Sequence, residues 1–220
     1  MTQTLVRTKR PKAPPLLFLR KFLKHGRRVA SFAPSSRPLA SAMCLHVSAT
    51  KPQTILELGA GTGAVTVVAA SRMHPESRLV ALEIDPHFCR VLRQQCPRAE
   101  VVCADVSDLP HQLDRLGIDR CDVLLNGLPT PSLPRSLNAV VLRAFQRFSS
   151  DSLFCQLTVM PWVYKPTYER LFEEVRFRLV MRNVPPGGIY FCRGLRSNYA
   201  DHLPGLDRES PPVAPPTDRF

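Results

Sequence analysis

Hydrophobic positions follow two alternating periods along most of this chain. Short apolar runs, each about as long as one buried strand, are separated by stretches in which apolar residues recur with the helical period. The predicted strands are 54–58, 78–82, 100–103, 121–125 and 152–157, and the predicted helices are 64–73, 87–95 and 137–148. Strands that alternate with helices predict βαβ units and a parallel sheet that is covered on both faces.

The end of this pattern differs from the rest. Two apolar runs, 176–184 and 189–195, flank Pro185-Pro-Gly-Gly188 with no helical stretch between them. Such a pair of runs predicts two strands joined as a hairpin. Together the runs predict an α/β fold whose seven-stranded, mostly parallel sheet finishes in an antiparallel carboxyl-terminal hairpin.

Proline content and charge mark the segments outside this sheet. Residues 1–15 are basic and rich in proline, which predicts a flexible arm, whereas 201–220 hold five of the 22 prolines and predict a disordered tail. Residues 16–53 are expected to form an amphipathic helix and a second helical segment before a single domain over 54–200. No apolar run is long enough to span a bilayer and no signal peptide is evident, so the expected compartment is the cytoplasm.

The net charge of +12 is concentrated in the first quarter of the chain. Eleven Lys and Arg precede Glu57, which is the first acidic residue, so the remaining residues carry a net charge of only +1. Such asymmetry predicts that this end meets a polyanion, either an anionic membrane surface or a nucleic acid. The seven cysteines show neither zinc-ligand nor disulfide spacing, and no metal site is expected.

A helix that begins near Leu16 would separate its apolar and basic residues onto opposite faces. Aromatic and leucine side chains fall in one half-circle and cationic ones in the other, as in helices that lie in the plane of an anionic membrane. Packing on the protein's own domain and contact with RNA stay open as alternatives. The residues expected to contact the membrane here are Phe18, Arg20, Lys21, Phe22, Lys24 and Arg27.

A glycine-rich turn joins the first predicted strand to its helix. Gly59, Gly61 and Gly63 would let the backbone approach a nucleotide-type cofactor closely, but their spacing is ambiguous, because Gly59, Gly61 and Ala64 also satisfy the looser dinucleotide fingerprint GxGxxA. Glu57 favours S-adenosylmethionine, because a carboxylate suits a cationic ligand and disfavours a pyrophosphate. Glu83 and Asp105 end the next two strands, where they can accept the ribose hydroxyls and the adenine amino group. The predicted cofactor contacts are Glu57, Gly59, Ala60, Gly61, Thr62, Gly63, Glu83, Ile84, Asp105 and Val106.

Four successive segments resemble the ordered motifs of class I methyltransferases. They are Leu56-Glu-Leu-Gly-Ala-Gly-Thr-Gly63, Leu82-Glu-Ile-Asp-Pro86, Ala104-Asp105 and Asn126-Gly-Leu-Pro129. This resemblance implies a Rossmann-like sheet with S-adenosylmethionine as the cofactor.

The flanking segments Phe32-Ala-Pro-Ser-Ser-Arg-Pro-Leu-Ala40 and Asn183-Val-Pro-Pro186 narrow the resemblance. Together with Asn126-Gly-Leu-Pro129, Tyr190 and Arg193, they resemble the small soluble bacterial phospholipid N-methyltransferases and their ornithine-lipid relatives, over about residues 18 to 196. The resemblance implies methylation of an aminolipid at the inner face of the cytoplasmic membrane, with phosphatidylethanolamine as the first expected substrate and ornithine lipid as the second.

Candidate substrate residues follow from the same resemblance. Asn126 is expected to orient the acceptor amine and Tyr190 to line its site, while Ser35, Ser36, Arg37 and Arg193 are expected to meet the lipid. Thr130 stands where adenine methyltransferases carry a stacking aromatic residue, which disfavours a nucleic-acid substrate but leaves RNA methylation as the alternative. The family's Gln-Phe-Thr-Tyr is replaced by Gln156-Leu-Thr-Val159, which puts the preferred lipid in doubt.

Overall fold

The computed structural model describes residues 37–159, 162–182 and 186–205. The predicted basic arm and amphipathic helix lie outside these ranges, as do eight of the predicted membrane or substrate residues: Phe18, Arg20, Lys21, Phe22, Lys24, Arg27, Ser35 and Ser36. Arg37 is the one member of that set before the sheet whose position is described.

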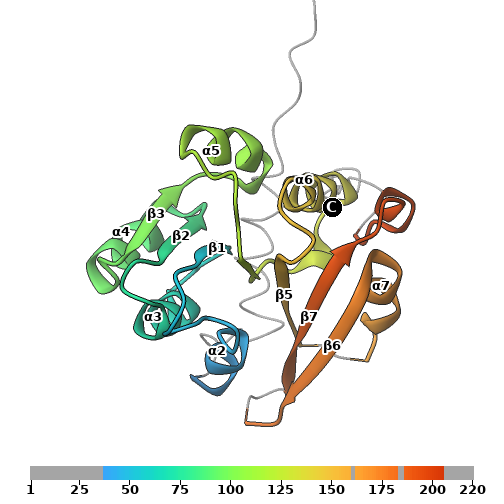
Figure 1. Ribbon diagram of the computed structural model, residues 1–220, viewed down its shortest axis with the longest axis horizontal. Helices are drawn as coiled ribbons and strands as arrows, with labels where there is room; N and C mark the ends of the chain where they lie inside the picture. Colours follow the sequence, from blue (N-terminus) through green and yellow to red (C-terminus); the bar gives the residue numbers. More distant parts are fainter. Residues whose placement is uncertain (1–36, 160–161, 183–185, 206–220) are drawn as a thin grey trace, which may run out of the picture. The chain divides into compact units, whose positions relative to one another are not determined.

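A seven-stranded sheet with the order β3-β2-β1-β4-β5-β7-β6 forms the centre of the described structure (Figure 1). β1 to β5 run parallel, whereas β7 pairs antiparallel with both β5 and β6. The predicted fold is confirmed, and the first five strands begin and end within two residues of their predicted bounds. The strands are β1 Thr54–Leu58, β2 Arg78–Glu83, β3 Ala99–Cys103, β4 Val123–Asn126, β5 Leu153–Thr158, β6 Phe172–Val180 and β7 Gly187–Leu195.

Helices cover both faces of the sheet (Figure 1). The α-helices are α2 Arg37–Met43, α3 Ala64–Arg72, α4 Pro86–Gln95, α5 Leu109–Arg115, α6 Arg135–Gln146 and α7 Lys165–Leu171, and the 3-10 helices are η1 Val106–Asp108, η2 Thr130–Ser132 and η3 Tyr199–His202. The sequence did not predict α5 and α7, because seven residues are too few to establish a helical period. Within the described ranges, no helix has the length and apolar character needed to cross a bilayer.

Alternation along the strands divides the core between the two faces. Ile55, Val123 and Leu125 pack with α2 and α3 in one apolar cluster. On the other face, Phe154 contacts Phe145 of α6 and Phe172 of β6, with both pairs of ring centroids 5.3 Å apart. Both faces of β1, β4 and β5 are buried, which explains why apolar residues follow one another without alternation in the sequence of these strands.

The carboxyl-terminal hairpin differs from its prediction at the turn. Gly187 and Gly188 belong to β7 itself, and β6 begins at Phe172 rather than at residue 176. A Cβ atom at Gly188 would overlap the ring of Phe177 across the ladder. This glycine is therefore explained by close packing between two strands rather than by turn geometry.

The predicted tail also starts later than expected. Residues 199–202 form η3, and the chain then contacts α6, where Asn138 donates to the Pro204 carbonyl at 2.8 Å and Arg135 donates to the Leu203 carbonyl at 3.0 Å. The described part of the tail is thus held by side-chain donors of α6. The remaining residues, 206–220, lie outside the described ranges.

Candidate active site

The glycine turn after β1 leaves bare backbone at the carboxyl edge of the sheet. Gly59, Gly61 and Gly63 have positive φ angles of 72°, 55° and 83°, a conformation that favours glycine. At Gly59 and Gly63 a Cβ atom would also meet Leu128 and Leu92, whereas at Gly61 no atom lies within 4 Å of that position. The backbone of Gly61 therefore faces open space that a ligand can approach closely.

Glu83, at the end of β2, fixes this turn through both carboxylate oxygens. Its Oε2 accepts the Gly61 N–H at 2.7 Å, and its Oε1 accepts the N–H groups of Ile84 and Asp85, each at 2.9 Å. A carboxylate offers about four acceptor positions, so these three bonds leave capacity for a ligand hydroxyl. Asp105 stands at the end of the neighbouring strand, where its Oδ1 accepts the Ser107 N–H at 2.8 Å and caps η1.

Glu57 carries the least satisfied carboxylate of this edge. It is 3% exposed, and neither its Oε2 nor the Oγ1 of nearby Thr66 has a hydrogen-bond partner among the residues described. Burial raises the pKa of Glu57 to about 7; the Thr66 hydroxyl, which lies close without completing a hydrogen bond, lowers the pKa, and Glu83 raises it. A buried charge without a partner is unfavourable in free energy, so a cationic ligand group beside this carboxylate would stabilise its ionised form.

A second polar cluster lies at the ends of β4 and β5. The Asn126 Nδ2 donates to the Gln156 Oε1 at 2.7 Å and to the Thr130 Oγ1 at 3.2 Å, and Thr130 donates to the same Gln156 oxygen at 2.8 Å. All three side chains are buried. A small cavity adjoins them and is lined in part by Phe154 and Tyr168.

This cluster determines which atom of Asn126 can meet a substrate. Both amide hydrogens are used, while among the described residues the Oδ1 accepts only the Leu128 N–H, at 3.3 Å. A carbonyl oxygen has two lone pairs, so the Oδ1 can accept a further N–H. The geometry gives Asn126 the role of an acceptor rather than of a donor.

Tyr190 lies beside this cluster, on the neighbouring strand β7. It pairs with Gln156 in the sheet register and is fully buried between Tyr168, at a centroid distance of 4.7 Å, and Phe177, at 4.9 Å. Burial raises its pKa to about 12, with smaller contributions from Cys192 and Glu169. Tyr190 is therefore neutral near pH 7, and its ring packs between Tyr168 and Phe177 next to Gln156.

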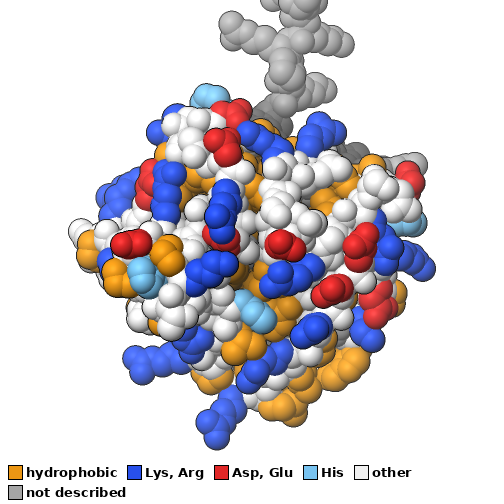
Figure 2. Space-filling model, in the orientation of Figure 1, with side chains coloured by type: hydrophobic (Ala, Val, Ile, Leu, Met, Phe, Trp, Pro, Cys, Tyr) orange, Lys and Arg blue, Asp and Glu red, His pale blue; other side chains and the backbone are white. Residues whose placement is uncertain are grey.

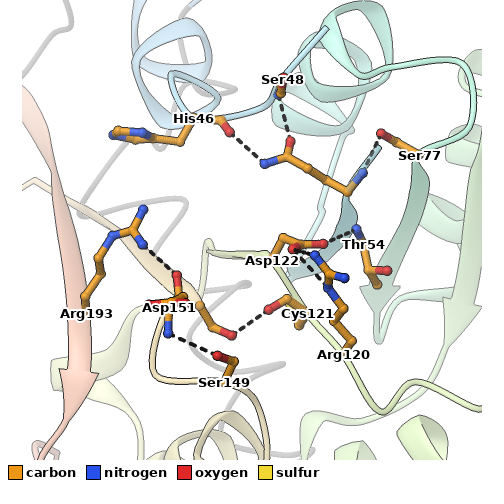
Figure 3. A network of polar contacts seen from close by, with 12 residues as sticks. His46, Ser48, Thr54, Ser77, Arg120, Cys121, Asp122, Ser149, Asp151 and Arg193 are labelled. Carbon is orange, nitrogen blue, oxygen red and sulfur yellow. Dashed lines mark hydrogen bonds and ion pairs between the residues drawn. The ribbon is translucent and has the colours of Figure 1, made fainter. Parts of the chain in front are cut away.

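The structure separates Arg193 from these residues. Its Nη1 donates to the Asp151 carbonyl at 2.6 Å, just before β5, at the amino edge of the parallel strands. Figure 3 shows Arg193 beside this loop, among polar contacts that include Asp122 and Thr54 at the beginning of β1. Arg193 therefore lies at the edge opposite to the glycine turn and Asn126, which stand at the carboxyl edge, and its contact with a lipid stays a prediction. Arg37 is exposed at the start of α2.

Thr66, Thr130 and Gln156 are site residues that sequence reasoning did not assign. Each is a polar side chain within an apolar run or a proline-rich turn, and each is buried. The signal that could have identified them is polarity at a buried position, since such groups need partners. Which partners they have depends on the pairing of β4 with β5 and of α3 with β1.

Comparisons with known proteins agree with this geometry. Residues 55–143 match the family described as "Methyltransferase domain". The chain is also 44% identical over 187 residues to an ornithine lipid N-methyltransferase of Singulisphaera acidiphila, an alignment that covers 83% of this chain and 97% of that relative.

Solved structures show the same fold at low identity. The O-methyltransferase of Bacillus cereus, in complex with S-adenosylhomocysteine, superposes with a TM-score of 0.58 at 17% identity, over 83% of this chain and 92% of that one. The O-methyltransferase TomG of Streptomyces achromogenes, in complex with S-adenosylmethionine, gives a TM-score of 0.59 at 15% identity, over 83% and 91%.

Proposed function

The chain belongs to the class I S-adenosylmethionine-dependent methyltransferases, and we propose that it transfers methyl groups from this cofactor to the amine of a membrane aminolipid. The observation that carries the proposal is its 44% identity with an ornithine lipid N-methyltransferase across nearly the full length of that relative. Ornithine lipid is therefore the first acceptor to test, ahead of phosphatidylethanolamine.

In this proposal, three carboxylates at the carboxyl edge each bind a different part of the cofactor. Glu57 pairs with the cationic methionyl portion, since it is buried without a hydrogen-bond partner for its Oε2 among the described residues. Glu83 accepts the ribose hydroxyls while it holds Gly61, and Asp105 accepts the adenine amino group. Ala60, Thr62, Gly63, Ile84 and Val106 complete the proposed contacts along the same turns.

S-adenosylmethionine supplies an electrophilic methyl group on a sulfonium, and the protein must present a neutral amine to it. A free alkyl ammonium has a pKa of about 10.4, so the acceptor must lose a proton before it reacts. Exclusion of water lowers that pKa, because burial disfavours the charged form. The Asn126 Oδ1 then accepts an N–H of the amine and directs its lone pair, while Gln156 and Thr130 hold the Asn126 amide in place.

Peripheral membrane association is part of the proposal. The support is the sequence of the amino-terminal region, where aromatic residues such as Phe18 and Phe22 face away from Arg20, Lys21, Lys24 and Arg27 on a helical wheel. Basic residues near anionic lipid contribute about 1 kcal/mol each, which suits reversible binding at the cytoplasmic face of the membrane. Ser35, Ser36 and Arg37 remain proposed contacts of the lipid.

Radiolabelled methyl transfer tests the function directly. The full-length protein is incubated with labelled S-adenosylmethionine and with vesicles that contain ornithine lipid, phosphatidylethanolamine or neither, and with total RNA in parallel. We expect label in the lipid extract of aminolipid vesicles. If label appears only in RNA, the proposed aminolipid substrate is wrong and the substrate is RNA, while the assignment of the cofactor stands.

A further inference from the structure

A group of large apolar side chains is exposed at the carboxyl edge of the sheet, next to the proposed acceptor site. Trp162 is 72% exposed, Met181 67%, Val163 58% and Leu179 38%. Side chains of this size are normally buried, and exposed groups of them mark surfaces that contact another apolar phase. We call these four residues the edge patch.

The fold brings the two halves of the edge patch to one place. Thr158, at the end of β5, pairs with Gly188, and Gly188 pairs with Leu179 of β6, so the three stand side by side across the sheet. Trp162 and Val163 follow β5 on the way into α7. Met181 comes directly after β6, at the start of the turn to β7.

The edge patch also lies on the same face of the sheet as the acceptor cluster. Val180 packs with α2 on one face, so alternation directs Leu179 to the other face. Phe177 points in that second direction as well, where it contacts Tyr190, the register partner of Gln156. Gln156 is in turn the register partner of Asn126, so Asn126 and Leu179 lie on the same face of the sheet at its carboxyl edge.

Charge around the edge patch is asymmetric. β6 begins with Glu173 and Glu174 but continues with Arg176 and Arg178, and Arg182 follows Met181; all five are exposed. Figure 2 shows hydrophobic side chains at the lower edge of the molecule, the region of the β6–β7 hairpin in Figure 1, with Lys and Arg side chains close by. Alternation places Arg176 and Arg178 on the face of β6 opposite to Leu179, whereas Arg182 directly follows Met181. An edge strand with apolar side chains at its end and arginines along it complements a layer of anionic headgroups over acyl chains.

We propose that the edge patch is a membrane-docking surface that enters the headgroup region of an anionic bilayer and turns the acceptor site towards its lipid substrate. This inference rests on the proposed function, because docking at this corner is useful for a substrate held in a membrane. It differs from the predicted amino-terminal helix in residues, in location and in the side chains that enter the lipid.

Trp162 is the chain's only tryptophan, so its fluorescence reports on the edge patch alone. The full-length protein is mixed with phosphatidylglycerol–phosphatidylethanolamine vesicles, with and without bromine on the acyl chains. Docking predicts that Trp162 emission shifts to shorter wavelength and is quenched by the brominated lipid. The double variant V163S/M181S, which keeps this reporter, is expected to need about tenfold more lipid for half-maximal binding, a loss of about 1.4 kcal/mol.

The matched control is Leu45→Ser, which changes a 48% exposed leucine just after α2. Leu45 lies at the amino edge, because the preceding Cys44 carbonyl accepts a hydrogen bond from Arg72 at the end of α3. Its vesicle affinity should match that of the wild type, and all variants should bind S-adenosylmethionine normally. Vesicle binding with unchanged Trp162 emission would overturn the docking surface. A shift of the Trp162 emission that appears without lipid as the protein concentration rises would also overturn it, because the edge patch would then contact a second copy of the chain.

The two proposals can fail separately in these experiments. If the protein methylates aminolipid while Trp162 stays in water on the vesicles, the proposed function stands and the edge patch has no part in it. Insertion of Trp162 with no methylation of any aminolipid would retain the docking surface and overturn the proposed substrate.

Discussion

Asn126 and Gln156 end two neighbouring parallel strands, and their side-chain amides are joined by a hydrogen bond of 2.7 Å. Because the Gln156 oxygen takes one Asn126 hydrogen and Thr130 takes the other, the Asn126 Oδ1 is turned towards the turn that follows β4. A residue on β5 thus sets the chemical role of a residue on β4. The orientation of an acceptor amine depends on this pairing.

Asn126→Ala should lower kcat by about a hundredfold while the affinity for S-adenosylmethionine stays within about twofold, because it removes the acceptor for the amine N–H. Asn138→Ala is the matched control: it also removes a buried amide, which donates to the Thr130 and Pro204 carbonyls. Both variants should lose about 1 to 3 kcal/mol of stability. Equal losses of kcat in the two would show that Asn126 acts only through folding.

Cofactor affinity should depend on pH through Glu57. Its pKa is raised to about 7 by burial, whereas pairing with a cation favours the ionised form, so binding must release a proton below that pH. Affinity should fall by about tenfold per pH unit below pH 7 and level off above it. Calorimetry in two buffers of different ionisation enthalpy measures the released proton, and Glu57→Gln should abolish both effects.

Glu57 should also make the unliganded protein less stable at higher pH. A carboxyl whose pKa is raised from 4.5 to about 7 on folding binds its proton more tightly in the folded state, so the free energy of unfolding falls as pH rises through this interval. The shift corresponds to about 3 kcal/mol. Thermal unfolding should show Glu57→Gln to be more stable than the wild type at pH 8 and nearly equal to it at pH 4.

Gly61→Ala and Gly117→Ala form a matched pair. Both glycines have positive φ angles, 55° and 60°, and neither would place a Cβ atom within 4 Å of another group. Each substitution should therefore cost about 1 kcal/mol through backbone strain alone. Only Gly61→Ala should weaken S-adenosylmethionine binding, by at least about tenfold, because its methyl group occupies the space where the ligand approaches the backbone. Similar affinities in the two variants would move the cofactor away from this turn.

Glu83→Ala should abolish detectable cofactor binding in calorimetry, because the Gly61, Ile84 and Asp85 N–H groups lose their acceptor together with the ribose. Asp122→Ala removes a comparable carboxylate, which accepts the Thr54 N–H at 2.8 Å, but at the amino edge of the sheet. It should bind S-adenosylmethionine as the wild type does. Retained binding in Glu83→Ala would contradict the assignment of this carboxylate.

Some of the site could be predicted because each of its parts is determined by a short segment of the sequence. Gly59, Gly61 and Gly63 need positive φ angles, and Glu57, Glu83 and Asp105 are tied to the ends of strands whose apolar runs are unmistakable. Parallel strands then bring these ends to one edge by the rules of the fold. Local conformation and hydrophobic period were sufficient for this half of the site.

Other features depended on contacts between residues far apart in the chain. The positions of Leu179 level with the end of β5 and of Arg193 at the opposite edge follow from β7 inserting between β5 and β6, which no local pattern records. The same insertion buries Tyr190 between Tyr168 and Phe177. The sequence by itself determined the strands, the glycine turn and its acids, because these rest on backbone conformation and burial along one segment. Only the tertiary structure decided which polar groups meet and which apolar groups stay exposed, because both depend on the order and register of strands.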